Sequence, residues 1–282
     1  MATCTGRKFP SAWQTRLSRL RFGLRQRLAS QLSVATEDFS LQFVCNSPME
    51  EMRVHSLLVK EEGTIAWLKQ YLRPGDVFLD VGANIGLYTL VAAQYVGPQG
   101  RVYAVEPHSV NVISLLQNVA ANGLKDRVHV IPSALHDSSG VFTFNYYSLE
   151  PGSAMSQLGG TRDGYEQEFV PVMTEMKVAV SIDDLIARHG MAAPHHIKID
   201  VDGNELQVVE GMMGLLRGPA RPRSVQVEVN ARYKEELFGR LEEAGYALTQ
   251  THYTAAGKAS LAKGDDPDTI PFNVVLEPRA LA

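Results

Sequence analysis

Short apolar strands alternate with helices between residues 77 and 135, and this alternation constrains the fold more than any other feature of the chain. The strand "VFLDV" precedes a helical segment from Gly86 to Tyr95, and the strand "RVYAVEP" precedes the helix-like run "HSVNVISLLQNVAANGL". A third strand, "RVHVIPSAL", comes next. Strand–helix–strand units of this size build a parallel sheet with right-handed crossovers. We therefore expect an α/β fold with an open parallel sheet.

The alternation lapses near residue 140 and then returns. Apolar and polar residues alternate along Val141–Tyr147, as in an antiparallel strand. In the Ser148–Glu175 segment after it, apolar residues recur with no clear period, which is typical of functional lids or disordered loops. "SIDDL" resembles a helix start, because a capping serine stands three residues before an acid. "HIKID" and "SVQVEVN" are predicted strands, "YKEELFGRLEEAG" is a predicted helix, and Tyr246–Thr251 with Pro271–Leu276 completes about seven sheet strands.

The chain divides into an N-terminal extension, residues 1–60, and one α/β domain, residues 61–282. In the extension, basic residues precede the first acid, Glu37, and apolar residues recur between them at helical spacing. We expect a basic amphipathic helix, then a short strand or loop. The helix would contact an anionic membrane or a partner, or else pack on the domain or fray. The residues concerned are Arg7, Lys8, Arg16, Arg19, Arg21, Arg25 and Arg27, with Trp13, Leu17, Leu20, Leu24 and Leu28.

Charge and cysteine content argue against several classes of protein. The net charge of −4 does not fit a nucleic-acid-binding surface. No apolar run approaches the roughly 18–20 residues that cross a bilayer, and the extension lacks the continuous apolar core of a secretory signal. Cys4 and Cys45 are too few for a disulfide framework, so we expect a reducing, cytoplasmic setting.

The segment "FLDVGANIG" places a turn at the end of the first strand, where open parallel sheets bind ligands. Any such fold needs a glycine there, but Gly82 and Gly86 also remove side chains where a ligand approaches. Glu106 ends the next strand, where a carboxylate can accept hydrogen bonds from both hydroxyls of a ribose. Together with Asp80 and Asn84, these residues predict a nucleoside-bearing cofactor.

The glycine spacing distinguishes between cofactors. Dinucleotide folds usually carry G-x-G-x-x-G, which brings a pyrophosphate to a helix N-terminus, whereas this turn is G-x-x-x-G. The Asp80 carboxylate would repel a pyrophosphate and attract an ammonium group. S-adenosylmethionine has a ribose, a sulfonium and an ammonium but no phosphate, so it is the predicted cofactor. Ser133 and Ala134, after the third strand, are predicted to contact the adenine, with Asp137 close behind them.

Two later strands carry polar residues on one face, although strands covered on both faces are normally apolar throughout. Because side chains alternate between faces, the two polar sides meet beside the cofactor if the strands are neighbours. One interpretation is a structural ion pair, since unpaired buried charges are costly. We favour a reaction pocket in which Asp200 orients or deprotonates a hydroxyl, with Lys198 and Glu228 as further catalytic candidates. The polar residues are Lys198, Asp200, Asp202, Gln226, Glu228 and Asn230.

A metal site is a weaker alternative in this region, and we predict no metal. Glu205 fits better as a first-turn acid that the helix dipole stabilises. His195 and His196 stand just before a strand and are expected at the surface. The oxygen ligands available to a metal are Asp200, Asp202, Glu205 and Asn230.

Six segments together resemble the FkbM-type S-adenosylmethionine-dependent methyltransferases: "FLDVGANIGLYTL", "VYAVEP", "SALHD", "SIDDL", "IKIDVDGNELQVVEGM" and "VQVEV". The resemblance covers roughly Glu61 to Pro278, and its most specific part is the run Lys198–Glu205. It implies a Rossmann-like class I methyltransferase fold: a seven-stranded, mostly parallel sheet with an antiparallel last strand and helices on both faces. It also implies methyl transfer to a hydroxyl of a sugar, glycan or secondary metabolite.

The resemblance assigns roles by position. Asp80, Gly82, Asn84 and Gly86 would form the cofactor turn, Glu106 would hold the ribose, and Asp200 would stand beside the transferred methyl group. Asp202 occupies a position where glutamate is commoner, which puts a direct role for it in doubt. The predicted partner is a small-molecule or glycan acceptor, whose identity the sequence does not give. We expect residues 148–175 to shape that specificity.

Two other functions compete with methyl transfer. A nicotinamide-dependent dehydrogenase or epimerase would use the same type of sheet, but it needs a pyrophosphate-binding turn and usually a Tyr/Lys or Cys/His reaction pair. A non-catalytic methyltransferase-like module would act through the basic extension. The glycine turn, the ribose acid and the polar strands favour an enzyme over such a module.

Overall fold

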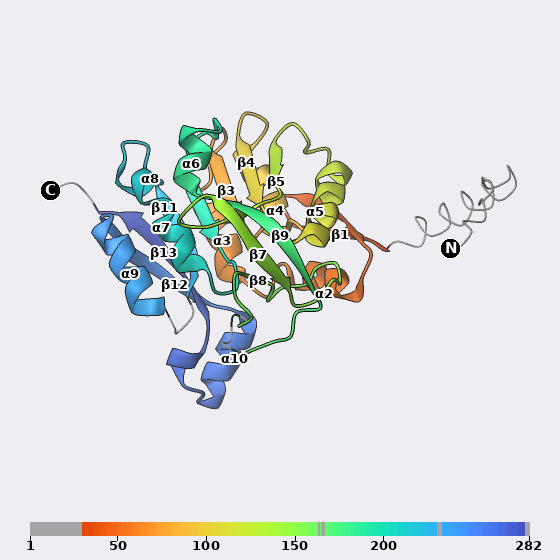
Figure 1. Cartoon of the computed structure of the whole chain (residues 1–282). Helices are drawn as coiled ribbons and strands as arrows, with labels where there is room; N and C mark the ends of the chain where they lie inside the picture. Colours follow the sequence, from red (N-terminus) through yellow and green to blue (C-terminus); the bar gives the residue numbers. More distant parts are fainter. Residues whose placement is uncertain (1–29, 163, 165–166, 230–232, 280–282) are drawn as a thin grey trace, which may run out of the picture.

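One large sheet organises the computed structural model, which describes residues 30–162, 164, 167–229 and 233–279 (Figure 1). Its strand order is β12-β13-β11-β10-β3-β4-β5. The strands from β11 to β5 are parallel, and β13 is antiparallel to both β11 and β12. The predicted seven-stranded sheet with an antiparallel last strand is therefore confirmed. The bounds are β3 (Val77–Val81), β4 (Arg101–Val105), β5 (Val128–Ile131), β10 (His196–Ile199), β11 (Ser224–Val229), β12 (Tyr246–Tyr253) and β13 (Phe272–Pro278).

Helices cover both faces of this sheet, and each face has its own core. Side chains alternate along β3, so Phe78 joins the core under α3, α4 and α5 while Leu79 joins the core under α6 to α9. Both side chains are fully buried, which contributes about 1.5–3 kcal/mol each. The helices are α3 (Glu62–Tyr71), α4 (Leu87–Val96), α5 (Ser109–Ala121), α6 (Ile182–Ala187), α7 (Glu205–Glu210), α8 (Met213–Arg217) and α9 (Lys234–Glu243), with α10 (Ala255–Lys263) and the 3-10 helix η2 (Pro267–Thr269) between β12 and β13.

A second sheet of four strands, in the order β6-β9-β7-β8, was not predicted. The expectation of a single strand through residues 127–135 was wrong. The strand β5 ends at Ile131, because Pro132 has no N–H to donate and the Ser133 N–H turns back to the Ile131 carbonyl at 2.9 Å. The antiparallel pairing of β7 with β9 confirms the alternation read in residues 141–147. The bounds are β6 (Ala134–Leu135), β7 (Gly140–Tyr146), β8 (Gln157–Leu158) and β9 (Met173–Val180).

The described part of the N-terminal extension packs on the α/β domain. It contains the antiparallel hairpin β1 (Ser30–Ala35) and β2 (Ser40–Cys45), and then α2 (Pro48–Ser56). Phe43 of β2 joins the core under α4 and α5. The Val44 N–H donates to the side-chain oxygen of Asn118 in α5 at 2.8 Å. The predicted basic amphipathic helix, and the contact proposed for it, lie outside the described residues.

Two further observations concern membrane-spanning helices and the cysteines. Among the residues that the structure describes, no helix has the length and apolar character needed to cross a membrane. Cys45 is buried with a free thiol, and Cys4 lies outside the described residues.

Candidate active site

The glycine turn joins β3 to α4 at the carboxyl edge of the sheet. Gly82 has a φ of +80° and Gly86 a φ of +91°, in the left-handed region that glycine favours. A Cβ atom on Gly82 would lie 1.8 Å from the carbonyl oxygen of Asp200, and one on Gly86 would lie 2.5 Å from Cδ1 of Leu115. The glycines thus allow neighbouring segments of the chain to approach, in addition to clearing space for a ligand.

Asn84 and Glu106 are joined directly at this turn. The Asn84 N–H donates to Glu106 Oε2 at 2.7 Å, and the His108 N–H donates to Glu106 Oε1 at 2.9 Å. Burial raises the pKa of Glu106 to about 7, although these two N–H groups lower it. Glu106 borders a cavity of about 380 Å³, counting its open mouth, that Gly82 and Asp200 also line. The predicted ribose acid therefore faces a space beside the turn.

Asp80 lies behind the turn and is 1% exposed. Its Oδ2 accepts a hydrogen bond from the Thr89 hydroxyl at 2.5 Å, while its Oδ1 is buried with no partner among the described residues. It pairs with Lys198 in the parallel register of β3 and β10. Burial raises the pKa of Asp80, and the Lys198 charge lowers it. This position allows Asp80 to act through its charge, and a direct contact with the cofactor stays a prediction.

The predicted adenine residues separate in the structure. Ala134 lines an apolar cavity of about 360 Å³ that shares Gly82 with the turn. The buried Ser133 hydroxyl has no partner among the described residues. Asp137 is exposed and bonds to its neighbours in the chain rather than facing the cavity. The apolar wall, which suits an aromatic base, consists of Val81, Val105, Ala134, Leu135, Phe144 and Leu158.

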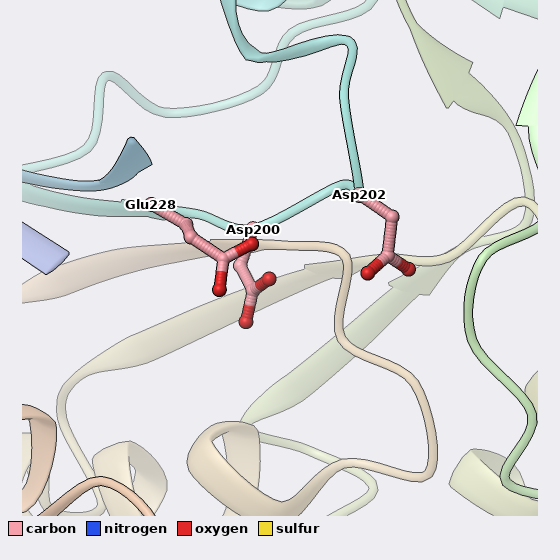
Figure 2. A group of neighbouring side chains, drawn as sticks. All are labelled: Asp200, Asp202 and Glu228. Atoms are coloured by element: carbon pink, nitrogen blue, oxygen red, sulfur yellow. The ribbon is translucent and has the colours of Figure 1, made fainter. Parts of the chain in front are cut away.

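The three catalytic candidates meet in a larger cavity of about 1100 Å³, counting its mouth. Lys198 Nζ donates to Asp200 Oδ2 at 2.8 Å and lies 5.0 Å from the centroid of the Tyr88 ring. Figure 2 shows the carboxylates of Asp200 and Glu228 side by side where their strands end, with Asp202 a short distance away. Gly82 also lines this cavity, so the turn and the three candidates share one space.

The charges of this cluster shift the pKa values of Asp200 and Glu228 in opposite directions. Burial raises the pKa of Asp200, but the charges of Lys198 and Lys60 outweigh burial and lower it below its usual value. Burial and the charge of Asp200 raise the pKa of Glu228 well above its usual value. Burial lowers the pKa of Lys198, and the charges around it, led by Asp200, raise it overall. The cluster thus lowers the pKa of Asp200 and raises that of Glu228, so Asp200 is the more readily ionised of the two.

Other contacts account for the acids that we considered as metal ligands. One oxygen each of Asp200, Asp202 and Glu228 lies within 4.8 Å of the others. Asp202 Oδ2 accepts the Met155 N–H at 2.9 Å. Glu205 Oε1 accepts the N–H groups of the turn before α7, at 3.1 and 3.2 Å, so Glu205 holds that turn. Asn230 lies outside the described residues.

The expectation that His196 lies at the surface was wrong. Its side chain is 2% exposed, whereas that of His195 is 47% exposed. His196 Nδ1 and the Ser224 hydroxyl are 2.7 Å apart, and Ser224 accepts a hydrogen bond from Trp67 Nε1 at 3.1 Å. Burial lowers the pKa of His196 to about 4. This polar group belongs to the interior of the fold.

The extension supplies one wall of the large cavity, which sequence reasoning missed. Arg53 lies on α2, and Lys60 and Glu61 lie in the turn after it. Glu61 is 4% exposed and accepts a hydrogen bond from the Thr64 hydroxyl at 3.0 Å. The Ser47–Glu50 capping box is a sequence signal for the start of α2. It could have revealed the helix, but not the place where the helix packs.

Residues 150–153 connect this wall to the cofactor turn. The Ser47 hydroxyl donates to the Pro151 carbonyl at 2.7 Å, and Arg53 Nε donates to the Gly152 carbonyl. The Ser153 carbonyl accepts from the side-chain amide of Asn84 at 2.9 Å. The predicted specificity segment thus begins by bridging α2 and the turn.

Comparisons with known proteins agree with this geometry. The family model described as "Methyltransferase FkbM domain" matches residues 80–248, more than half of the chain. The chain is 33% identical over 161 residues to the 31-O-demethyl-FK506 methyltransferase FkbM of Streptomyces tacrolimicus, covering 50% of this chain and 61% of that relative. It is 25% identical over 190 residues to the hexuronic acid methyltransferase AglP of Haloferax volcanii, covering 67% of this chain and 72% of that relative.

Solved structures are more distant. The crystal structure of methyltransferase FkbM from Methylobacillus flagellatus KT has a TM-score of 0.45 and 14% identity, covering 93% of this chain and 60% of that chain. That similarity is too low to add to the argument.

Proposed function

Because the chain belongs to the FkbM methyltransferase family, we propose that it transfers a methyl group from S-adenosylmethionine to a hydroxyl oxygen of a sugar, glycan or secondary metabolite. Two relatives carry names that fit this reaction, one a methyltransferase of 31-O-demethyl-FK506 and the other of hexuronic acid. The observation that carries the proposal is Asp200, ionised beside Lys198 in a cavity that the cofactor turn also lines.

The residues present fit S-adenosylmethionine better than a dinucleotide. Glu106 faces the cavity where a ribose would lie, and the apolar wall around Ala134 suits an adenine. Asp200 and Asp202 border the same cavity as Glu106, and carboxylates there attract a cationic group and repel a pyrophosphate. Tyr88 and Lys198, a Tyr/Lys pair that lines the large cavity, meet through the aromatic ring, as a cation–π contact. This geometry does not favour the dehydrogenase alternative.

The bound cofactor would supply an electrophilic methyl group on its sulfonium. Asp200 would align the acceptor hydroxyl behind that methyl group and take its proton as the new oxygen–carbon bond forms and the carbon–sulfur bond breaks, which leaves the demethylated, uncharged thioether. Lys198 keeps Asp200 ionised and fixes its position. The raised pKa of Glu228 favours its protonated form, which would donate a hydrogen bond beside Asp200 rather than compete as a base.

Titration calorimetry tests the cofactor part of the proposal. Wild-type protein should bind S-adenosylmethionine and its demethylated product and should not bind NAD. Glu106→Gln should weaken binding of the methyl donor by about 1–3 kcal/mol, the worth of charge-assisted hydrogen bonds. A matched Glu62→Gln variant, at an exposed glutamate that pairs with Lys258 on the surface, should bind normally. Binding of NAD alone would overturn the proposal.

Turnover tests the enzymatic part. Wild-type protein with labelled methyl donor and a panel of hydroxylated sugars and macrolide-type alcohols should produce labelled ether products. Cofactor binding with no methyl transfer to any hydroxyl would instead favour the non-catalytic module.

A further inference from the structure

Two cations, Arg53 and Lys60, line the large cavity together with the acids Glu61, Asp200, Asp202 and Glu228. Arg53 and Lys60 come from the segment around α2, and Asp200 and Glu228 come from the ends of the sheet strands. Acids beside the cofactor turn are explained by the reaction and by the positive charge of the methyl donor. The two cations favour the ionised form of Asp200 through their charge, and that chemistry assigns them no contact with the acceptor.

Direct contacts within the protein occupy Arg53 and Lys60 only in part. The hydrogen bond of Arg53 Nε goes to the uncharged carbonyl of Gly152, and among the described residues Arg53 has no carboxylate within ion-pair distance. Lys60 Nζ lies 3.4 Å from Glu61, longer than an ordinary charge-assisted hydrogen bond, and half of its side chain is exposed. Glu61 is also engaged by the Thr64 hydroxyl. Arg53 therefore has no protein acid of its own, and the ion pair of Lys60 with Glu61 still leaves half of the Lys60 side chain exposed.

The two cations act on the same space. Burial lowers the pKa of Lys60, and nearby acids, led by Glu61, raise it above its usual value overall. The charge of Arg53 lowers the pKa of Lys60, so the two cations repel each other. Both cations also stabilise the ionised Asp200 from across the cavity. Two like charges facing one opening create a preference for an anion between them, and a guanidinium suits a planar carboxylate.

We propose that Arg53 and Lys60 bind a carboxylate of the acceptor, so that the acceptor is an acidic molecule such as a sugar acid. This inference rests on the proposed function, because it places the acceptor hydroxyl at Asp200. The half-exposed Lys60 and the exposed Met52 beside it mark the mouth through which an acceptor enters. An acidic acceptor anchored there presents a neighbouring hydroxyl toward the sheet edge.

Glucuronate and its methyl ester, which has the same ring without the charge, test the inference. Both are titrated by NMR into protein saturated with the demethylated cofactor. Wild-type protein should bind glucuronate at least about 10-fold more tightly than the ester. Arg53→Gln and Lys60→Met should each remove most of that preference. The control variants Arg188→Gln and Lys258→Met, at exposed surface ion pairs, should keep it.

The carboxylate of the cofactor is the competing source of an anion. Affinity for the demethylated cofactor should therefore change less than about 3-fold in Arg53→Gln and Lys60→Met. If that affinity falls 10-fold or more, while 5′-methylthioadenosine, which lacks the carboxylate, binds equally to all variants, the cations serve the cofactor and the inference is overturned. It is equally overturned if wild-type protein does not distinguish glucuronate from the ester.

Failure of the proposed function gives a different result. Wild-type protein would then bind no demethylated cofactor, and the glucuronate comparison, repeated without it, would still show whether the two cations bind a carboxylate.

Discussion

The polar face shared by β10 and β11 behaves differently at its two ends. At the amino end, His196, Ser224 and Gln226 lie under α3, and each is at most 2% exposed. At the carboxyl end, Asp200 and Glu228 are partly exposed and line a cavity. The same two strands, the same side of the sheet and similar residue types thus give a closed interior at one end and an open site at the other.

What covers the strands explains the difference. Trp67 of α3 fills the space over the amino end and donates to Ser224, and Gln226 Nε2 donates to the Thr64 hydroxyl at 2.7 Å. Before the first turn of α3, residues 57–61 connect this helix to α2. Residues of this connection line the large cavity together with Asp200, so no helix covers Asp200 as α3 covers the amino end. On β10 and β11, the polar residues are therefore available to a ligand only where α3 does not cover them.

Replacing the ionised acid of the open end should have the largest effect. Asp200→Asn keeps the shape and removes the charge that orients the hydroxyl and takes its proton. Turnover should fall by about 10²–10⁴-fold, the usual worth of a general base. Affinity for the methyl donor, measured by calorimetry, should change little. Retained turnover would move Asp200 to the structural class, and a collapse of cofactor affinity would assign it to binding.

Low pH should destabilise the fold through His196, at the closed end. The folded-state pKa of His196 is lowered to about 4 by burial, from an ordinary value of 6.5. Between these values the unfolded state binds more protons, so the stability linked to His196 is complete above pH 6.5 and is lost as pH falls toward 4. The loss should reach roughly 2–4 kcal/mol. Urea unfolding of wild type and His196→Gln across this range measures it, and parallel curves would contradict it.

Breaking the hydrogen bonds of the closed end should affect stability alone. Ser224→Ala leaves Trp67 Nε1 and His196 Nδ1 without their buried partner, which should lower the free energy of unfolding by about 1–3 kcal/mol. Turnover per folded molecule should be unchanged, because Ser224 does not line the cavity. Chemical denaturation and an assay at matched folded concentration separate the two effects. A loss of turnover without a loss of stability would erase the distinction between the ends.

The smallest effect is expected at the second acid of the open end. Burial and the charge of Asp200 raise the pKa of Glu228 well above its usual value, which favours the protonated form. Glutamine has the shape of that protonated side chain and carries no charge, so Glu228→Gln should change turnover by less than about 10-fold. A loss as large as that of Asp200→Asn would show that Glu228, and not Asp200, is the base.

Local patterns were enough to predict the large sheet and the cofactor turn. The strand–helix repeat and "FLDVGANIG" depend on residues close together in the chain, and the sheet and the glycine turn after β3 were confirmed, while cofactor binding at that turn stays a prediction. Similarly, alternation in "HIKID" and "SVQVEVN" correctly indicated one shared polar face. It could not indicate where α3 would cover that face, and so His196 was wrongly expected at the surface.

Long-range contacts account for what was missed. The strands β6 and β8 are two residues long each and depend on partners in β9 and β7, so no local pattern defines them. The cavity wall from α2 depends on contacts such as Arg53 with Gly152, about a hundred residues apart. The Ser47–Glu50 capping box shows that a helix begins there and does not reveal what the helix covers.

The close approach of Gly82 to the Asp200 carbonyl couples the glycine turn to the segment that carries the proposed catalytic acid. A side chain at position 82 would collide with the backbone at 1.8 Å, so neither segment can diverge without the other. The wall from α2 comes from a separate stretch of chain and reaches the cavity through its side chains. Under the proposed function, residues of α2 could therefore be replaced to accept a different acceptor while the contact between Gly82 and Asp200 is kept.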